Sequence, residues 1–411
     1  MNLPERTIAV GNKNSQTLQS GPSFEHIEET FDSSRDLVCY SHLRWDFVYQ
    51  RPQHVLSRFA REGRVFYVEE ALYEGDAPAL SMRVDKSGVC VVVPRLPPGT
   101  SPAAAISIQK DLLRKMYEDC AIRDCVAWYY TPMARAFTSD LPSCVIVYDC
   151  MDELSLFRGA PTELREYEAQ LMTVADVVFT GGLSLFEAKR QFHPNVHPMP
   201  SSIDVDHFKA ARTLLDEPPE MKVIPRPRMG FAGVIDERMD IDLLQAVAAA
   251  VPEWHFVLVG PVVKIDPQSL PSLANIHYLG RKAYEELPSY LAGWDVALMP
   301  FAKNDATRFI SPTKTPEYLA AGKPVVSTSI RDVVQTYQDT GLVQIADTPP
   351  EFIAAIQGSL RTASDARQYQ QWLMRADAFL AKTSWDRTWM SMMKQLERVI
   401  ASRTISHDIK A

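Results

Sequence analysis

Short apolar runs alternate with helical sequence patterns along most of this 411-residue chain. The runs are continuously hydrophobic, which is typical of strands that helices cover on both faces of a parallel sheet. They form two series, separated by the proline-rich segment Pro218 to Pro227. The first series comprises residues 36–42, 64–69, 125–130, 145–149 and 176–180, and the second comprises residues 229–233, 255–260, 275–280, 295–300 and 324–328. The pattern predicts an α/β fold with two Rossmann-like, doubly wound domains.

The proline-rich break sets the predicted domain boundaries. We expect a polar, loosely ordered extension over residues 1–35, an N-terminal Rossmann-like domain over 36–215, a C-terminal Rossmann-like domain over 216–380 and a terminal segment over 381–411. Neither domain contains Gly-x-Gly-x-x-Gly or a P-loop. Their absence argues against a nicotinamide dehydrogenase and against a P-loop kinase.

Composition narrows the class of protein further. The formal net charge of −8, without any Lys/Arg-rich run, argues against nucleic-acid binding. The six cysteines lack metal-ligand spacing, so we expect reduced thiols in a cytoplasmic protein. No apolar stretch approaches the ~20 residues that span a bilayer, and residues 1–36 lack the apolar core of an export signal. An amphipathic helix over residues 106–116 either packs on the core or contacts a membrane surface.

The segment Ser311 to Val326 combines a helix start with groups suited to a nucleotide. Ser311 and Pro312 favour a helix start, and Gly322 favours its end. Lys314 and Glu317, three residues apart, fall on neighbouring positions of one helical face. We expect Ser311, Thr313 and Lys314 to bind a diphosphate, and Glu317 to accept hydrogen bonds from a ribose diol. The alternative is a Lys314–Glu317 salt bridge on a solvated helix surface.

The same segment resembles the donor-binding signature of GT-B glycosyltransferases, Glu-x-x-Ala-x-Gly-x-Pro-Val. Its Ser-x-x-Lys-x-x-Glu form resembles bacterial polysaccharide transferases, including xanthan-type glucuronosyltransferases. Upstream, residues 175–180, Ser184, residues 200–204 and Phe208 follow the order of a GT-B chain. The resemblance implies a GT-B fold, with two domains facing across a cleft and a last helix, over residues 385–400, that returns to the N-terminal domain.

The resemblance also implies the partners. The donor is a nucleoside-diphosphate sugar, linked to UDP or GDP, and no cofactor is needed. The acceptor is a lipid-linked sugar or a growing polysaccharide, which brings the protein to the cytoplasmic face of the inner membrane as a peripheral contact.

Further donor residues are expected where strands of the C-terminal domain end, because ligands of doubly wound sheets bind there. Gly233 allows the backbone to approach a diphosphate, and Arg238 supplies charge in the same turn. The turn at Arg281 resembles the family's nucleobase-binding turn, which holds the base mostly through backbone contacts. Arg308 precedes the helix of the donor signature, and we expect it to face phosphate.

The general base is expected in the N-terminal domain, where one strand ends with the acids Asp149, Asp152 and Glu153. In the glucuronosyltransferases that this chain resembles, a Tyr-x-x-x-Asp segment supplies the base, and Asp152 falls on that Asp. Neighbouring carboxylates would raise one another's pKa toward neutrality. His42, at the end of the first strand, is the second candidate. In the alternative interpretation, Asp152 caps the next helix.

The acceptor is expected to contact the loop after the first strand, which is rich in functional groups. The candidate acceptor-binding residues are Arg44, Trp45, Arg51 and His54, together with Asp149.

The stereochemistry of transfer is predicted from one position at which this chain differs from retaining GT-B enzymes. Many retaining GT-B enzymes carry Glu-x7-Glu, and Phe309 occupies the place of the earlier glutamate. We therefore expect an inverting transferase, with a retaining transferase as the alternative. No Asp-x-Asp in the chain resembles the constellation of a metal-dependent donor site, so we expect metal-free catalysis. A GT-B-fold epimerase and a non-catalytic nucleotide-sugar-binding scaffold remain alternatives.

Overall fold

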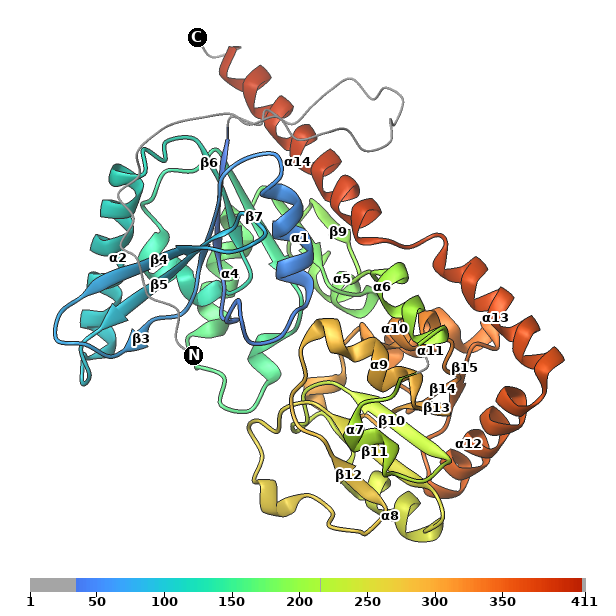
Figure 1. Ribbon diagram of the computed structural model, residues 1–411. Coiled ribbons are helices and arrows are strands. Elements are labelled where there is room, and N and C mark those ends of the chain that lie inside the picture. The colour runs from blue at the N-terminus through green and yellow to red at the C-terminus, as the bar shows by residue number, and fades with distance from the viewer. Residues whose placement is uncertain (1–34, 215, 409–411) are drawn as a thin grey trace.

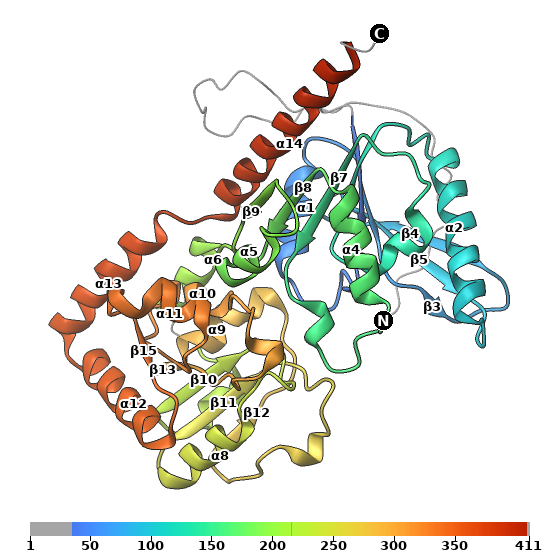
Figure 2. The same cartoon turned by 180° about the vertical axis from the view of Figure 1, so that it is seen from behind.

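The computed structural model describes residues 35–214 and 216–408. These residues form two α/β domains, each with a sheet between layers of helices (Figures 1 and 2). The two-domain Rossmann-like prediction is confirmed. The predicted extension over residues 1–35 falls, except for Arg35, outside the described residues.

The first sheet has nine strands within the described residues, in the order β3-β5-β2-β1-β6-β7-β8-β9, with β4 beside β5. The strands are β1 (Asp36–Tyr40), β2 (Val65–Val68), β3 (Leu72–Tyr73), β4 (Ala79–Val84), β5 (Cys90–Leu96), β6 (Cys125–Tyr129), β7 (Val145–Cys150), β8 (Val177–Thr180) and β9 (Val196–Pro198). All pairs are parallel except β4 with β5. The sequence did not predict this antiparallel hairpin, because β4 is half-exposed and lacks a continuous apolar run.

The second sheet has six strands in the described residues, all parallel, in the order β12-β11-β10-β13-β14-β15. They are β10 (Arg228–Ala232), β11 (His255–Val259), β12 (Ile276–Tyr278), β13 (Val296–Met299), β14 (Val325–Ser327) and β15 (Val343–Ile345). The strand order reverses at β10 in this sheet and at β1 in the first. Ligands of such sheets bind beyond the carboxyl ends of the strands at the point of reversal, which places the site near these two strands.

Helices cover both faces of each sheet (Figure 1). They are α1 (Arg51–Phe59), α2 (Pro102–Asp119), α3 (Arg135–Thr138), α4 (Leu164–Val174), α5 (Leu183–Lys189), α6 (Val205–Lys209), α7 (Pro219–Lys222), α8 (Ile241–Ala250), α9 (Leu287–Ala292), α10 (Lys314–Ala320), α11 (Arg331–Tyr337), α12 (Pro349–Ser364), α13 (Ala366–Leu380) and α14 (Trp385–Asp408). The chain crosses back at its end: Trp385, Met392 and Leu396 of α14 are buried with α1 in one core of the first sheet.

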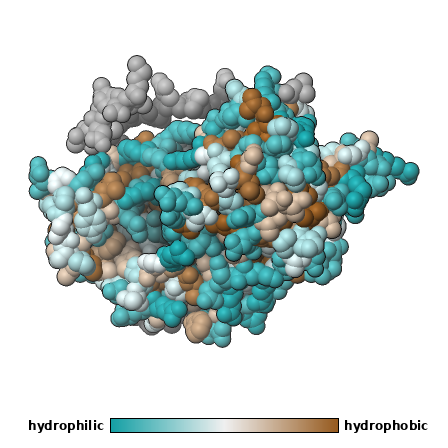
Figure 3. Space-filling view, turned by 90° about the horizontal axis from the view of Figure 1, so that it is seen from below, coloured by the Kyte–Doolittle hydropathy of each residue, from teal (hydrophilic) through white to brown (hydrophobic). Residues whose placement is uncertain are grey.

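Helix α2 packs on the other core of the first domain. Its apolar residues Leu113 and Met116 are buried there, and Lys110 and Arg114 pair with Asp140. The core-packing alternative for this helix is therefore correct. No helix in the described ranges is long and apolar enough to cross a bilayer. The face shown in Figure 3 is mainly hydrophilic, with scattered groups of apolar side chains.

Candidate active site in the cleft between the domains

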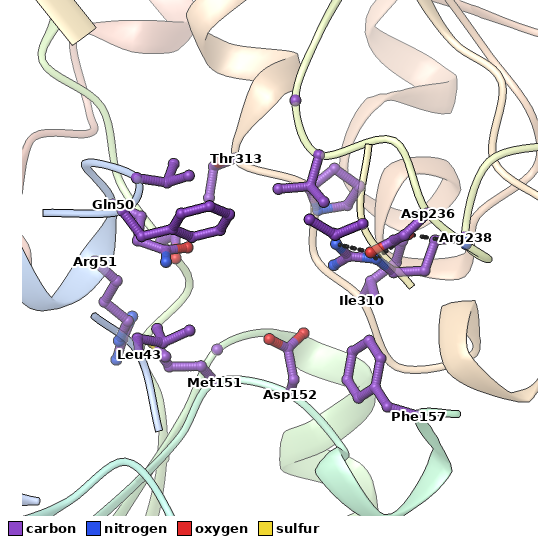
Figure 4. Close-up of a pocket in the computed structure, with 18 of the residues that line it drawn as sticks. Leu43, Gln50, Arg51, Met151, Asp152, Phe157, Asp236, Arg238, Ile310 and Thr313 are labelled. Atoms are coloured by element: carbon purple, nitrogen blue, oxygen red, sulfur yellow. Dashed lines mark hydrogen bonds and ion pairs between the residues drawn. The ribbon is translucent and has the colours of Figure 1, made fainter. Parts of the chain in front are cut away.

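A cavity of about 730 Å³ lies between the two domains and is lined by residues of both. Its walls include the loops that follow β1 and β7 in the first domain, those that follow β10 and β11 in the second, and the segment that leads into α10. These are carboxyl ends of strands at and near the reversal of strand order. The volume is in the range of small-molecule sites. Figure 4 shows the two walls, with Asp152 pointing into the space between them.

On the second-domain wall, Lys314 Nζ lies 2.7 Å from Glu317 Oε2. Glu317 is only 8% exposed and both residues line the cavity, so the solvated-salt-bridge alternative is wrong. Burial raises the pKa of the Glu317 carboxyl, and Lys314 opposes the rise. The pair presents one hydrogen-bonding carboxylate and one ammonium to the cavity.

The helix that carries this pair begins later than predicted. It starts at Lys314, and no side chain caps its first turn. Ser311 and Thr313 therefore precede the helix instead of capping it, and both line the cavity. Because their hydroxyls are not used to cap α10, they remain available to a ligand.

Ser311 also touches the first domain. A Cβ added to Gly182 would lie 2.6 Å from Ser311 Cβ and 2.1 Å from Asp332 Oδ2. Asp332, from α11, accepts hydrogen bonds from the Leu183 and Ser184 amides at 3.0 and 3.1 Å, across the domain boundary. The domains thus meet at a contact that only glycine fits.

Gly182→Ala is expected to force this contact apart. Overpacking of this kind costs about 1–3 kcal/mol, and the opening should also lower affinity for any ligand held by Ser311. Thermal melting with and without ligand measures both effects. Gly358→Ala in α12 is the control, because its added methyl meets nothing closer than 3.7 Å. Equal ligand affinity in wild type and Gly182→Ala would show that this contact does not shape the site.

The turn after β10 carries Gly233 and Arg238 into the cavity. Arg238 Nε donates to Asp236 Oδ1 at 2.9 Å, and one terminal nitrogen donates to Oδ2 at 2.7 Å (Figure 4). Asp236, which sequence reasoning missed, is 2% exposed and fixes the direction of the guanidinium.

Two predicted donor residues lie elsewhere. The Arg281 guanidinium lies over the Phe47 ring, 5.3 Å from its centroid, and that of Arg308 lies 5.1 Å from the centroid of Phe309. Neither arginine lines the cavity. The structure corrects the assignment of Arg308, because a cation–π contact directs its side chain elsewhere. The Arg281 side chain is likewise directed away from the cavity, and the backbone contacts expected of its turn stay a prediction. Lys282, next to Arg281, lines the cavity instead and pairs with Glu220 at 2.7 Å.

On the first-domain wall, Asp152 occupies the turn between β7 and a short 3-10 helix over Leu154–Leu156. The residue before that helix is Glu153, and the Asp152 carboxylate accepts no hydrogen bond from the described residues. The capping alternative is therefore wrong. Burial raises the pKa of Asp152, Asp236 adds to the rise, and Arg238 opposes it.

The three acids of this turn do not act on one another as predicted. Asp149 is fully buried and accepts a hydrogen bond from Arg51, and Glu153 accepts a hydrogen bond from Lys189 at 2.5 Å. The raised pKa of Asp152 therefore comes first from burial, with a contribution from Asp236 across the cleft, and not from its sequence neighbours.

His42 lines the same wall, after β1. Burial lowers its pKa to about 4, and Lys264 adds to the effect. The imidazole is therefore neutral at pH 7. Its buried Nδ1 has no hydrogen-bond partner in the described part of the chain, so it is available to a ligand hydroxyl.

The predicted acceptor residues divide into two groups. Arg44 and His54 line the cavity; Arg44 pairs with Glu69 at 2.9 Å, and burial lowers the pKa of His54 to about 3.

The other three predicted acceptor residues are corrected. Trp45 is 6% exposed and packs edge-on against Tyr67 in the core. Arg51 and Asp149 form a buried ion pair at 2.7 Å, with 2% and 0% of their side chains exposed. Arg51 reaches the cavity wall, but its guanidinium also donates to the Met199 carbonyl at 2.6 Å. These groups hold the fold around the site and are not presented to a ligand.

Sequence reasoning also missed the cavity residues Lys264 and Phe157. Lys264 follows β11, so the rule that ligands bind at the carboxyl ends of strands could have found it. Phe157 comes from the loop after the Asp152 turn, and no local signal in the sequence singles it out.

Comparison with known proteins identifies the fold. Residues 226–362 match the family model described as glycosyl transferases group 1. The structure is similar to sucrose-phosphate synthase from Thermosynechococcus elongatus, with a TM-score of 0.65 and 14% identity, covering 90% of this chain and 100% of that one. The chain has the GT-B fold. A second GT-B-like neighbour is Anabaena HepE, solved in complex with UDP and glucose, with a TM-score of 0.63 and 13% identity over 88% of this chain and 99% of that one.

One curated relative matches part of the chain. It is the putative teichuronic acid biosynthesis glycosyltransferase TuaH of Bacillus subtilis, 24% identical over 261 residues. The match covers 59% of this chain and 65% of the Bacillus protein, so the chain spans slightly less than two thirds of that relative. The predicted resemblance to GT-B glycosyltransferases is confirmed, and the matching family model falls in the second domain.

Proposed function

We propose that this protein is a glycosyltransferase that moves a sugar from a nucleoside-diphosphate donor to an acceptor hydroxyl. The observation that carries the proposal is one cavity between the domains with complementary walls. The second domain presents the Lys314–Glu317 pair and Arg238, and the first presents the Asp152 carboxylate, which none of the described residues hydrogen-bonds. Nucleotide and acceptor thus have separate walls.

The donor is held on the second-domain wall. Glu317 accepts hydrogen bonds from the ribose diol, and Lys314, Ser311 and Arg238 bind the diphosphate. This arrangement stabilises the charge that develops on the leaving nucleoside diphosphate as its bond to the sugar breaks. The UDP found in Anabaena HepE makes UDP-sugars the first donors to test, with GDP-sugars beside them.

The reaction is a displacement at the anomeric carbon. The acceptor oxygen attacks that carbon, the bond to the diphosphate oxygen breaks, and Asp152 takes the acceptor hydroxyl proton. A raised pKa brings the base closer to neutral pH, as general-base catalysis favours. His42 accepts a hydrogen bond from the sugar or acceptor. Phe309, where a retaining enzyme would carry glutamate, packs against the core of the first domain. Its place supports inversion, and the anomeric configuration of the product tests this step.

The acceptor is a lipid-linked sugar or a growing polysaccharide at the cytoplasmic face of the inner membrane. The relative named for teichuronic acid biosynthesis supports a polysaccharide acceptor. Arg44 and His54, the two predicted acceptor residues that line the cavity without a buried ion pair, are the first to test for contact with it. Transfer needs neither a cofactor nor a metal in this proposal.

A donor panel tests the proposal. UDP- and GDP-sugars are added to wild type, Glu317→Ala and Glu253→Ala, an exposed carboxylate of the second domain that serves as control. At a hundredfold excess over Kd, a bound donor should stabilise wild type and the control by about 2.7 kcal/mol. Glu317→Ala should lose this stabilisation, as measured by thermal melting.

Two results would contradict the donor site. One is that no nucleotide sugar stabilises wild type, and the other is that Glu317→Ala binds as well as the control. A donor that binds but is never transferred or hydrolysed would favour the non-catalytic scaffold. Interconversion of the donor sugar without transfer would favour the epimerase.

A further inference from the structure

Lys264 has an unusual backbone conformation for a residue with a side chain. Its φ is 61°, in the left-handed region that residues other than glycine rarely adopt. The loop is held there because Ile235 N donates to the Pro261 carbonyl at 2.9 Å, and Val263 N donates to the Ile235 carbonyl at 3.0 Å. The loop after β11 is thereby fastened to the turn that carries Arg238. Such local strain persists where surrounding structure enforces it, often at functional sites.

Lys264 is also a cation without a carboxylate partner. It lines the cavity, and no acidic side chain in residues 35–214 or 216–403 lies within ion-pair distance of its ammonium. By contrast, Arg238, Lys282 and Lys314 each pair with a carboxylate at 2.7 Å. The positive charge of Lys264 is therefore available to a ligand.

The ammonium is held from across the cleft by Phe157. Lys264 Nζ lies 4.9 Å from the centroid of the Phe157 ring, and the Arg238 guanidinium lies 5.5 Å from the same centroid. The ring orients both cations without neutralising them, because it carries no formal charge. Asp236 pairs with Arg238, and the Asp152 carboxylate lies near enough to both cations for them to oppose the rise in its pKa, so a ligand anion here meets Lys264 as the cation without an ion-pair partner among the described side chains.

The corner lies at the reacting end of the cleft. The charge of Lys264 affects both first-domain side chains that take part in the proposed reaction. It lowers the pKa of His42 and opposes the rise in the pKa of Asp152. Both effects require proximity. An anionic group bound there would lie beside the bond that breaks.

We propose that Lys264 binds the β-phosphate of the nucleoside-diphosphate donor, as a second cation beside Arg238, and that Phe157 holds it in position from the first domain. The inference rests on the proposed function and adds to it a residue of the leaving-group site. A β-phosphate is the part of the donor that gains charge as the sugar leaves, so a free ammonium here favours the transition state.

The experiment compares ligands that differ only in that phosphate. Binding of UDP, UMP, GDP and GMP is measured by calorimetry on wild type, Lys264→Met, Lys264→Arg and Lys282→Met. Lys264→Met should weaken nucleoside-diphosphate binding by about tenfold or more, as expected for losing a hydrogen bond between charged groups, and change monophosphate binding less than about twofold. Lys264→Arg should retain most of the diphosphate affinity. Lys282→Met removes a cavity lysine that Glu220 already neutralises and should change both ligands equally.

Phe157 provides a second readout. Phe157→Leu should lower diphosphate affinity by less than Lys264→Met does, Phe157→Tyr should keep it, and adding Phe157→Leu to Lys264→Met should cost little more. Additive losses would show that the ring does not act through Lys264.

The outcomes separate this inference from the proposed function. Suppose that wild type binds nucleoside diphosphates, that Glu317→Ala loses this binding and that Lys264→Met keeps it. The inference then fails and the proposed function stands. UDP-glucose and UDP-glucuronate are titrated in the same way. If Lys264→Met loses affinity only for UDP-glucuronate and not for UDP or UDP-glucose, the cation binds a sugar carboxylate and the inference is overturned. If wild type binds no nucleotide, both fail.

Discussion

Asp152→Asn is expected to abolish sugar transfer while leaving donor binding intact. The amide keeps the shape of the carboxylate but cannot take the acceptor proton, and loss of a general base lowers kcat by roughly 10²–10⁴-fold. Glu317 and Lys314, on the opposite wall, are untouched. Steady-state kinetics with the donor found in the panel, together with donor-induced thermal stabilisation, measures the two effects separately.

The same substitution should make the protein more stable. Burial raises the pKa of Asp152, so the folded protein favours the protonated acid more than the unfolded chain does. The stability that this group contributes is full below the unfolded pKa and is lost as the pH rises through the folded pKa. Asparagine stays neutral, so Asp152→Asn should melt at a higher temperature than wild type near neutral pH, and the difference should shrink in acid.

His42→Asn is the matched comparison on the same wall. If Asp152 is the base, wild-type activity rises as the pH passes the raised pKa of Asp152, and His42→Asn keeps this profile with weaker binding. Full transfer by Asp152→Asn, with activity lost in His42→Asn, would move the base to His42 and contradict the proposed mechanism.

Most of the predicted residues that line the cavity follow from strand position. Apolar runs mark buried parallel strands, and the residues just beyond them reach the site through topology alone. This reasoning placed Asp152, His42, Gly233 and Arg238 on the cavity, and the family signature placed Glu317 and Lys314. Lys264 obeys the same rule but was missed, because no motif drew attention to its loop.

The errors share a different cause. Whether a side chain at the start of a helix points to a cavity or into the core depends on partners far away in sequence. Arg51 was predicted to bind the acceptor, yet its partner Asp149 lies 98 positions on. Similarly, the directions of Arg281 and Arg308 are set by aromatic rings, and nothing in the residues beside Trp45 shows that its ring is buried.

The buried Arg51–Asp149 pair is expected to be the most damaging ion pair to break. Arg51 is the first residue of α1, after the His42 loop, and Asp149 is the next-to-last residue of β7, before the Asp152 turn. Nε and one terminal nitrogen bind the two carboxylate oxygens at 3.0 and 2.7 Å. Removing one member leaves an uncompensated charge in the core, which typically costs about 3–5 kcal/mol.

Arg51→Met should therefore lower the free energy of unfolding by about 3–5 kcal/mol, as measured by urea denaturation. Arg58→Met is the matched control on the same helix. Its partner Asp386 is 61% exposed, so the loss should stay below about 1 kcal/mol. The double variant Arg51→Met/Asp149→Leu should regain much of the loss, because neither charge then remains buried. Equal losses in the single and double variants would mean that the cost comes from packing and not from the orphaned carboxylate. Recovery of folding without recovery of transfer would show that the pair also fixes the His42 loop relative to the Asp152 turn.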